Sequence, residues 1–166
     1  MLRFSDASVQ SFDWAQLRPM AQVYELTCAD GVMARFDARG FLLTQQASAE
    51  TAGQRLRFRY TAHETLVYDD DNVVARGLNS PNRIEFPSGP AYDFVASASG
   101  AGAFWIKDGK DRMVLHFERR EGSTWRARIS LEPDANVIPE VPVLACWVCW
   151  LRVTGSADLS PGSRFL

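Results

Sequence analysis

The sequence predicts a mainly β protein, an antiparallel closed barrel of roughly twelve strands around one buried apolar α-helix near the C-terminus. Three observations lead to this fold class. Short segments alternate apolar and polar residues, turn-forming residues separate those segments at close intervals, and one apolar segment near the C-terminus lacks a polar face. The first two observations indicate hairpins. The third indicates a helix that is buried on all sides.

Alternation with a period of two residues marks the strands. In residues 55–60, Leu56, Phe58 and Tyr60 share one face, while three arginines share the other. Successive side chains of a strand point to opposite faces of a sheet, so this segment is expected to bury its apolar face. The same pattern is found in residues 32–39, 83–86 and 125–132.

Turn-forming residues divide the chain into hairpins. Clusters of Asp, Asn, Gly, Pro and Ser stand between the alternating segments, at residues 29–31, 69–72, 87–90 and 108–111. These residue types favour the tight connections of antiparallel strands. Their spacing predicts about eleven or twelve short strands in a meander that forms a barrel or a sandwich.

The pattern becomes helical after residue 139. Residues 140–153 predict a helix about 21 Å long, with Glu140 at its N-terminus, Pro142 in its first turn and Arg152 in its last turn. The apolar run of residues 141–151 is too short to span a bilayer, which takes about 20 residues. The interior of the barrel is therefore the expected place for this helix.

Length and composition indicate one globular domain over residues 1–166. We expect an N-terminal approach over residues 1–20, barrel strands over 21–132, the central helix over 140–153 and a flexible tail over 154–166. The 18 basic residues are balanced by 20 acidic ones, which argues against nucleic acid as a partner. Three cysteines and the lack of an apolar leader predict a cytoplasmic protein without a membrane span, or one that is peripheral at a membrane.

No catalytic constellation stands out, so we expect a protein that is not an enzyme and that carries no cofactor and no metal. Cys146 and Cys149 have the spacing of a zinc or redox pair, with Cys28, His63 and His116 as further candidate ligands. Two cysteines on a wholly apolar helix are more simply interpreted as small core residues.

Two other segments contain residue types that are found in ligand sites. The three aspartates at residues 69–71 are of the type that binds calcium, but no EF-hand spacing follows them, so a solvated hairpin tip is expected. Residues 100–102 (Gly-Ala-Gly) lack the third glycine of a dinucleotide-binding loop and predict a flexible loop.

Two arginine ladders are the main candidates for a binding site. Arg55, Arg57 and Arg59 share one face of a predicted strand, and Arg126 and Arg128 share one face of another. If the two strands are neighbours, the five arginines form a cationic patch that can hold phosphate or carboxylate groups, because guanidinium is a bidentate donor. The alternative is a solvated surface on which carboxylates pair with the arginines across strands.

The order of segments resembles that of a known superfamily. Many short hairpins are followed by residues 105–109 (Trp-Ile-Lys-Asp-Gly), a last strand, residues 138–144 (Ile-Pro-Glu-Val-Pro-Val-Leu), Trp147 and Leu151. This order is similar to that of the tubby C-terminal-like superfamily, which includes phospholipid scramblases and LURP-one-related proteins, and most of all to its small bacterial members. The resemblance implies a barrel of about twelve strands around a central helix. Tubby proteins bind phosphoinositide headgroups through a Lys/Arg motif, and no segment here matches that motif.

Two functions are therefore expected in the first place. One is a non-enzymatic binding module for an anionic lipid headgroup or a membrane surface, which requires the five arginines to gather on one exposed face. The alternative is a protein-interaction or structural module without a small-molecule ligand. That alternative requires an exposed apolar patch, for which Trp14 and the C-terminal Phe165 and Leu166 are candidates.

Overall fold

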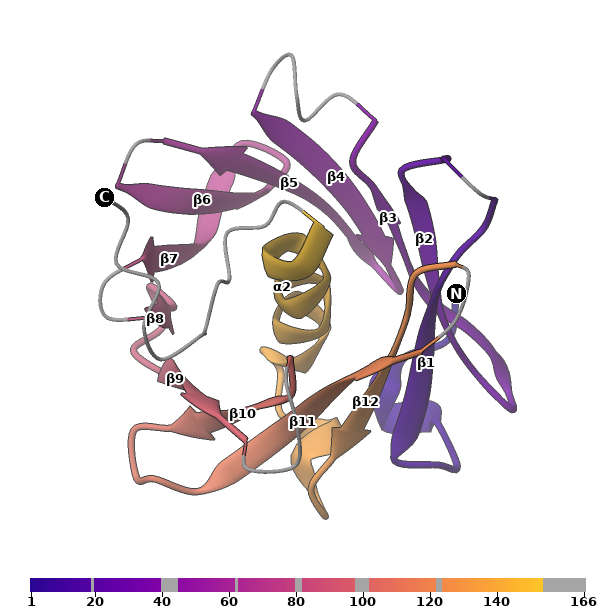
Figure 1. Cartoon of the computed structure of the whole chain (residues 1–166). Helices are drawn as coiled ribbons and strands as arrows, with labels where there is room; N and C mark the ends of the chain where they lie inside the picture. The colour runs from indigo at the N-terminus through magenta and orange to yellow at the C-terminus, as the bar shows by residue number, and fades with distance from the viewer. Residues whose placement is uncertain are drawn as a thin grey trace.

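A computed structural model describes residues 1–18, 20–39, 45–61, 63–79, 82–97, 102–121 and 124–153 of the chain. In these residues, twelve antiparallel strands form a closed barrel in which each strand pairs with its neighbours in the chain (Figure 1). The strands are β1 (Ser11–Gln16), β2 (Val23–Cys28), β3 (Gly31–Asp37), β4 (Gln46–Thr51), β5 (Gln54–Tyr60), β6 (Glu64–Asp69), β7 (Asn72–Asn79), β8 (Asn82–Glu85), β9 (Ala91–Ala96), β10 (Phe104–Asp108), β11 (Met113–Arg120) and β12 (Arg126–Leu131). The predicted fold class is confirmed.

Strand β1 closes the barrel. It pairs with β12, where Ser11 lies opposite Ser130, and with β2, where Asp13 lies opposite Thr27. The prediction that residues 1–20 only approach a barrel built from residues 21–132 was therefore wrong at its N-terminal boundary. The physical reason is that residues 11–16 alternate like the other strands, with the side chains of Phe12 and Trp14 fully buried inside.

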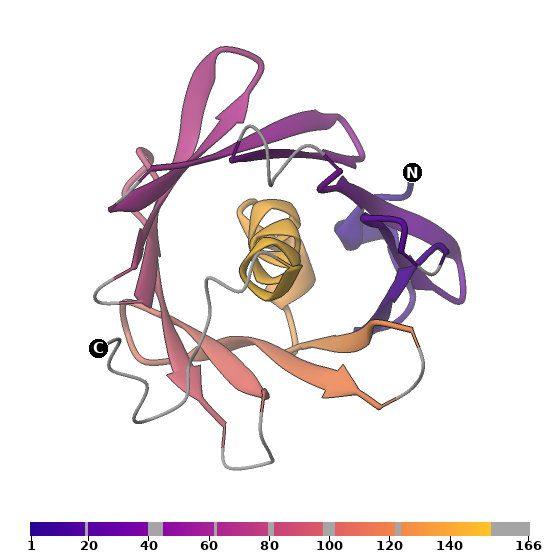
Figure 2. The ribbon, with the colours of Figure 1, turned by 45° about the horizontal axis from the view of Figure 1, so that its top comes forward.

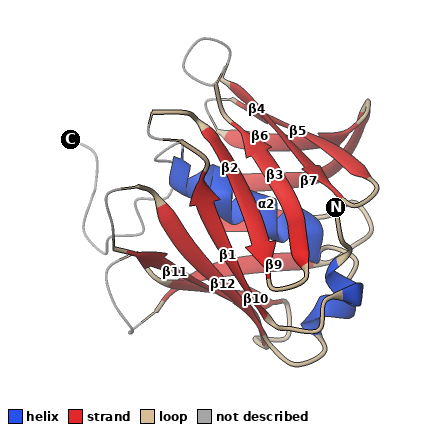
Figure 3. Ribbon diagram, turned by 90° about the vertical axis from the view of Figure 1, so that its right-hand side faces the viewer, coloured by secondary structure: helices blue, strands red, loops and turns tan. Residues whose placement is uncertain are grey.

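The helix α2 (Val141–Val153) occupies the interior of the barrel, as Figures 2 and 3 show from two directions. Its start is one residue from the predicted one. Pro142 lies in the first turn, and the carbonyl of Glu140 accepts the first helical hydrogen bond from the Leu144 amide at 2.9 Å. Every residue from Val143 to Leu151 is buried, so the helix supplies the centre of the hydrophobic core.

Aromatic rings join the helix to the strands. The Trp150 ring stacks on Phe58, with centroids 5.5 Å apart, and the Trp147 ring lies 6.3 Å from Phe58 and 6.4 Å from Phe94. The Trp147 ring also fills the place where a side chain of Gly77 would stand, since a Cβ there would lie 1.7 Å from Trp147 Cη2. The interior is thus occupied by the chain itself.

Polar contacts hold both ends of the helix. At its start, the Tyr92 hydroxyl donates to Glu140 Oε2 at 3.3 Å, and burial together with this carboxylate raises the pKa of Tyr92. At its end, Arg152 Nη2 donates to the Gly102 carbonyl at 2.5 Å and lies over the rings of Phe104 and Phe117. A cation in the last turn also complements the helix dipole.

Two short 3₁₀ helices lie at the end of the barrel where α2 begins, η1 (Phe4–Asp6) and η2 (Ala135–Val137) (Figure 3). They contact each other beside the turns that join β4 to β5 and β6 to β7. We call this the helix-start end. The opposite end carries the turns from β1 to β2 and from β5 to β6.

Candidate functional site

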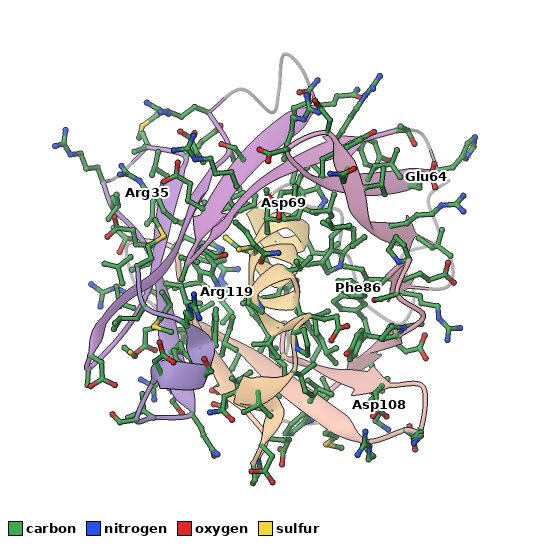
Figure 4. All side chains as sticks on the ribbon, turned by 180° about the vertical axis from the view of Figure 1, so that it is seen from behind. Arg35, Glu64, Asp69, Phe86, Asp108 and Arg119 are labelled. Carbon is green, nitrogen blue, oxygen red and sulfur yellow. The ribbon has the colours of Figure 1, made fainter. Side chains whose placement is uncertain are left out.

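The five candidate arginines point away from the core, as their strand alternation predicted. Arg55, Arg57, Arg59 and Arg126 are exposed, and Arg128 is half-buried. Charged side chains such as the labelled Arg35, Glu64 and Asp108 likewise surround the barrel on its outside, while the apolar side chains surround α2 (Figure 4).

The structure does not bring the five arginines together. Four strands (β1, β2, β3 and β4) separate β5 from β12, and these two strands lie on opposite sides of α2 in Figure 1. The expectation of one patch made of Arg55, Arg57, Arg59, Arg126 and Arg128 was therefore wrong. In a meander, strands far apart in the sequence become neighbours only where the barrel closes, and here that place is the pairing of β1 with β12.

On β12, a carboxylate neutralises one of the two arginines. Arg128 donates from Nε to Asp13 Oδ1 at 2.9 Å and from Nη2 to Asp13 Oδ2 at 3.1 Å, and these hydrogen bonds raise the pKa of Arg128. Arg126 lies opposite Arg120, and Nη2 of Arg120 is 3.7 Å from Oε2 of Glu118. For Arg128, the alternative of cross-strand pairing with carboxylates is the one observed.

On β5, Arg57 lines a shallow groove. It has a volume of about 360 Å³ on the outer face of β3, β4 and β5. Ser48 of β4 lies opposite both Asp37 of β3 and Arg57 of β5, so one row of side chains crosses the groove. We call it the arginine groove, and its lining residues are Asp37, Arg39, Gln46, Ala47, Ser48 and Arg57.

Among the described residues that line the arginine groove, Asp37 is the one carboxylate, and it is already engaged. Arg39 Nε donates to both oxygens of Asp37 at 3.0 Å, and Arg39 Nη2 donates to Oδ2 at 2.5 Å. The hydrogen bonds from Arg39 hold the pKa of Asp37 below its usual range, and those bonds raise the pKa of Arg39. Asp37 therefore orients Arg39 and leaves little negative charge for Arg57.

Arg57 is oriented by an aromatic ring and keeps its charge toward solvent. Its Cζ lies 4.9 Å from the centroid of the Tyr68 ring, and its Nη2 is 4.0 Å from Oδ1 of the fully exposed Asp71. Such a solvent-exposed ion pair contributes little to stability. Arg59 lies opposite Gln46 and Leu66, and no ion pair among the described residues includes it.

The third arginine of β5 differs from the other two. Arg55 lies opposite Glu50, which also lies opposite Arg35 of β3. The positive surplus of this surface is therefore centred on Arg57 and Arg59. Guanidinium groups beside the Ser48 hydroxyl and the Gln46 amide form a set of donors that suits an oxyanion.

Sequence reasoning identified Arg57 and missed most other members of the arginine groove. Arg39 belonged to a predicted alternating segment without being marked as a candidate. Gln46 and Ser48 lie on β4, a strand that we did not predict, because its inward residues Ala47 and Ala49 are too small to stand out as an apolar face. A groove across three strands also depends on their pairing, which a local pattern does not encode.

The other candidates have structural roles. Cys146 and Cys149 are fully buried, and burial raises the pKa of both thiols. Among the described residues, no group of three or more His, Cys, Asp or Glu side chains is arranged to hold a metal ion. The His116 ring lies against the Trp105 ring, with centroids 4.3 Å apart and the two planes tilted by 33°.

The remaining expectations concern turns and apolar patches. Asp69, Asp70 and Asp71 form the tip of the hairpin between β6 and β7, as predicted. Trp14 is fully buried, so its proposed place in an exposed apolar patch was wrong: it lies on the inward face of β1. Residues 154–166, with Phe165 and Leu166, and residues 100–101 of the Gly-Ala-Gly segment lie outside the described residues.

Comparison with known proteins gives a likeness in fold. No family model matches the chain, and no curated protein matches it. A crystal structure of a protein from Arabidopsis thaliana, AT5G01750, superposes with a TM-score of 0.61 at 12% sequence identity, over 92% of this chain and 96% of that chain. The two chains thus share the barrel fold over nearly their whole lengths.

Among the described ranges, no helix combines the length and the apolar character that crossing a membrane requires.

Proposed function

We propose that this chain is a tubby-like, non-enzymatic binding module that holds an anionic group, such as the phosphate of a lipid headgroup, in the arginine groove. The observation that carries the proposal is Arg57, whose guanidinium lies over Tyr68 beside a groove in which Arg39 engages the one carboxylate among the described lining residues. The proposal places the protein in the cytoplasm, at the surface of an anionic membrane.

The filled interior supports an outer site. Trp147 and Trp150 occupy the volume in which barrels of other proteins hold a ligand, so a binding group reaches this chain from outside or at its ends. Membership of the tubby-like superfamily is supported by the order of the segments and by the fold shared with the Arabidopsis thaliana protein.

Vesicle co-sedimentation tests the proposal. The full chain is mixed with phosphatidylcholine vesicles with and without phosphatidylserine, at low and moderate salt. Each arginine near an anionic surface contributes about 1 kcal/mol, so the double variant Arg57→Gln/Arg59→Gln is expected to bind about 30-fold more weakly. Binding should weaken as salt rises, because salt screens exposed charges.

The barrel supplies a matched control. Arg126→Gln/Arg128→Gln removes the same charge from the other side of the molecule and is expected to bind nearly like the parent chain. Equal losses in the two double variants would mean that net charge alone drives binding, and the proposal would be wrong. If the chain binds soluble inositol hexakisphosphate but does not bind phosphatidylserine vesicles, the ligand is a free phosphorylated molecule and not a membrane.

A further inference from the structure

A second groove crosses the helix-start end of the barrel, away from the arginine groove. It consists of three adjoining cavities of about 810, 250 and 290 Å³. The first two share the N-terminal segment and the turn from β4 to β5, and the second and third share Gln54 and Pro139. We call it the end groove, and the residues that define it here are Arg3, Thr51, Gln54, Asp70, Val137 and Pro139.

Thr51, a residue with a buried hydroxyl, lines the end groove. Thr51 lines both of the first two cavities, is only 7% exposed, and its Oγ1 has no hydrogen-bond partner within the described residues. The inward residues before it on β4, Ala47 and Ala49, are apolar. An unpaired buried hydroxyl is unfavourable, and a ligand with an amide or carbonyl group would satisfy it.

The widest cavity of the end groove is acidic. Four carboxylates line it (Asp6, Glu50, Asp69 and Asp70), against three cationic groups, the guanidinium groups of Arg3 and Arg55 and the amino group of Met1. The net charge of the side chains in the surrounding turns is also negative. Ten carboxylates and three cationic side chains lie in residues 1–10, 29–30, 69–71, 108–112 and 132–140. A ligand of complementary charge for this cavity is a cation.

The other arm of the end groove is apolar. Val137 is 66% exposed and Val73 is 41% exposed, and these two valines are among the few large apolar side chains that the described residues expose. Val137 lines the second cavity with Pro139 and Pro142, and Val73 lines the third with Phe86 and Val143. The amides of Gln54 and Asn136 lie between the two arms as donors and acceptors.

These parts fit one kind of occupant. We propose that the end groove binds an extended segment of a partner protein, with a Lys or Arg side chain in the acidic cavity and a nearby aliphatic side chain against Val73, Val137 and Pro139. The backbone amides of the segment would satisfy Thr51 Oγ1 and the Gln54 side chain. A small polyamine matches the acidic arm alone, and it leaves the exposed valines uncovered.

Selection from a phage-displayed library of random decapeptides on the full chain tests this proposal. We expect the enriched sequences to combine Lys or Arg with an aliphatic residue a few positions away. One enriched peptide is then synthesised and its binding measured by titration calorimetry. Asp70→Asn is expected to weaken binding by at least about fivefold, because it removes a charge from the acidic cavity.

Three variants make the result specific. Asp111→Asn is the matched control, because Asp70 and Asp111 both have a left-handed backbone that Asn tolerates, and Asp111 lies on the same end outside the groove. Thr51→Val preserves the shape of the side chain and should weaken peptide binding while the free protein stays folded by circular dichroism. Arg57→Gln/Arg59→Gln should bind the peptide like the parent chain, which separates this site from the arginine groove.

Several outcomes would overturn the proposal. If the selected sequences do not combine a basic residue with an aliphatic one, the proposal that a peptide segment binds the end groove is wrong. Equal losses in Asp70→Asn and Asp111→Asn would show attraction by net charge only. Spermine binding as tightly as the peptide would show that the apolar arm takes no part.

Discussion

The side chain of Asp37 connects the chemistry of the arginine groove to the stability of the fold. Its carboxylate receives the hydrogen bonds of Arg39, and these bonds hold its pKa below the usual value of 3.8. A carboxyl group whose pKa is lower in the folded chain contributes stability above its unfolded pKa and loses that contribution as pH falls through the folded pKa. The affected range therefore lies below about pH 4.

Asp37→Asn is expected to make the free energy of unfolding depend less on pH in this acidic range. Between about pH 5 and pH 3, the free energy of unfolding of the variant should fall less than that of the parent chain. The difference should be no more than about 1 kcal/mol, because the Arg39 side chain is 71% exposed and solvent screens the pair. Urea unfolding at each pH measures the difference. Arg39→Gln removes the other partner and should give the same flattening. A parent-like slope in both variants would show that the pair does not contribute.

Single residues also show where sequence reasoning succeeded. Arg55, Arg57 and Arg59 were placed on the outer face of a strand by alternation alone, and the structure agrees. Alternation did not predict which of these arginines would have a carboxylate beside it. Whether an arginine meets a carboxylate depends on the neighbouring strand, as the contrast between Arg128 with Asp13 and Arg59 with Gln46 shows.

At the scale of elements, the contact between α2 and β7 is the tightest that the structure shows at a glycine. Gly77 lies in the middle of β7, and the Trp147 ring takes the space that any side chain there would need. The Trp147 ring cannot shift easily, because it packs against Phe58 and Phe94. The backbone of β7 cannot shift easily either, because it is paired with a strand on each side.

Gly77→Ala is therefore expected to lower the free energy of unfolding by about 1–3 kcal/mol or more, the cost of overpacking a core. Denaturant unfolding followed by tryptophan fluorescence measures it. Gly109→Ala is the control, because nothing lies within 4 Å of the added methyl group and the backbone there is ordinary, so a change within about 0.5 kcal/mol is expected. Equal losses in the two variants would show that the close packing of Trp147 is not the cause.

The elements that sequence reasoning missed have physical explanations. Residues 11–16 alternate, but they form a single strand without a hairpin partner next to them on the N-terminal side, and their pairing with β12 spans most of the chain. Strand β4 buries only Ala47, Ala49 and Thr51. The helix was predicted closely, because a segment that is apolar all round has to be buried on all sides, and the interior of the barrel provides that place.

At the scale of the whole molecule, closure depends on β1. Without it, β2 and β12 would both present unpaired backbone groups, a known route to aggregation. A chain that lacks residues 1–16 is therefore expected to form larger species than the parent chain. Size-exclusion chromatography with light scattering measures this. Addition of a synthetic peptide of residues 1–20 should restore the parent's size, whereas parent-like size and melting temperature of the shortened chain would contradict the prediction.

The general architecture was readable from the sequence, while the sites were not. The approximate number of strands and the buried helix follow from local periodicity and turn residues, although β1 and β4 were not identified individually. Both grooves depend on the placement of distant segments, such as the N-terminal residues beside Thr51, and on which strands are neighbours.

The position of the helix also has a consequence for how the protein is made. All twelve strands precede α2 in the chain, so a ribosome releases the whole wall of the barrel before the segment that fills it. Until then, Phe36, Phe58, Phe94 and the other inward rings lack their main packing partners. Folding to the native state must therefore wait for this last element of the barrel, and until then the growing chain exposes an aromatic surface of the kind that chaperones bind.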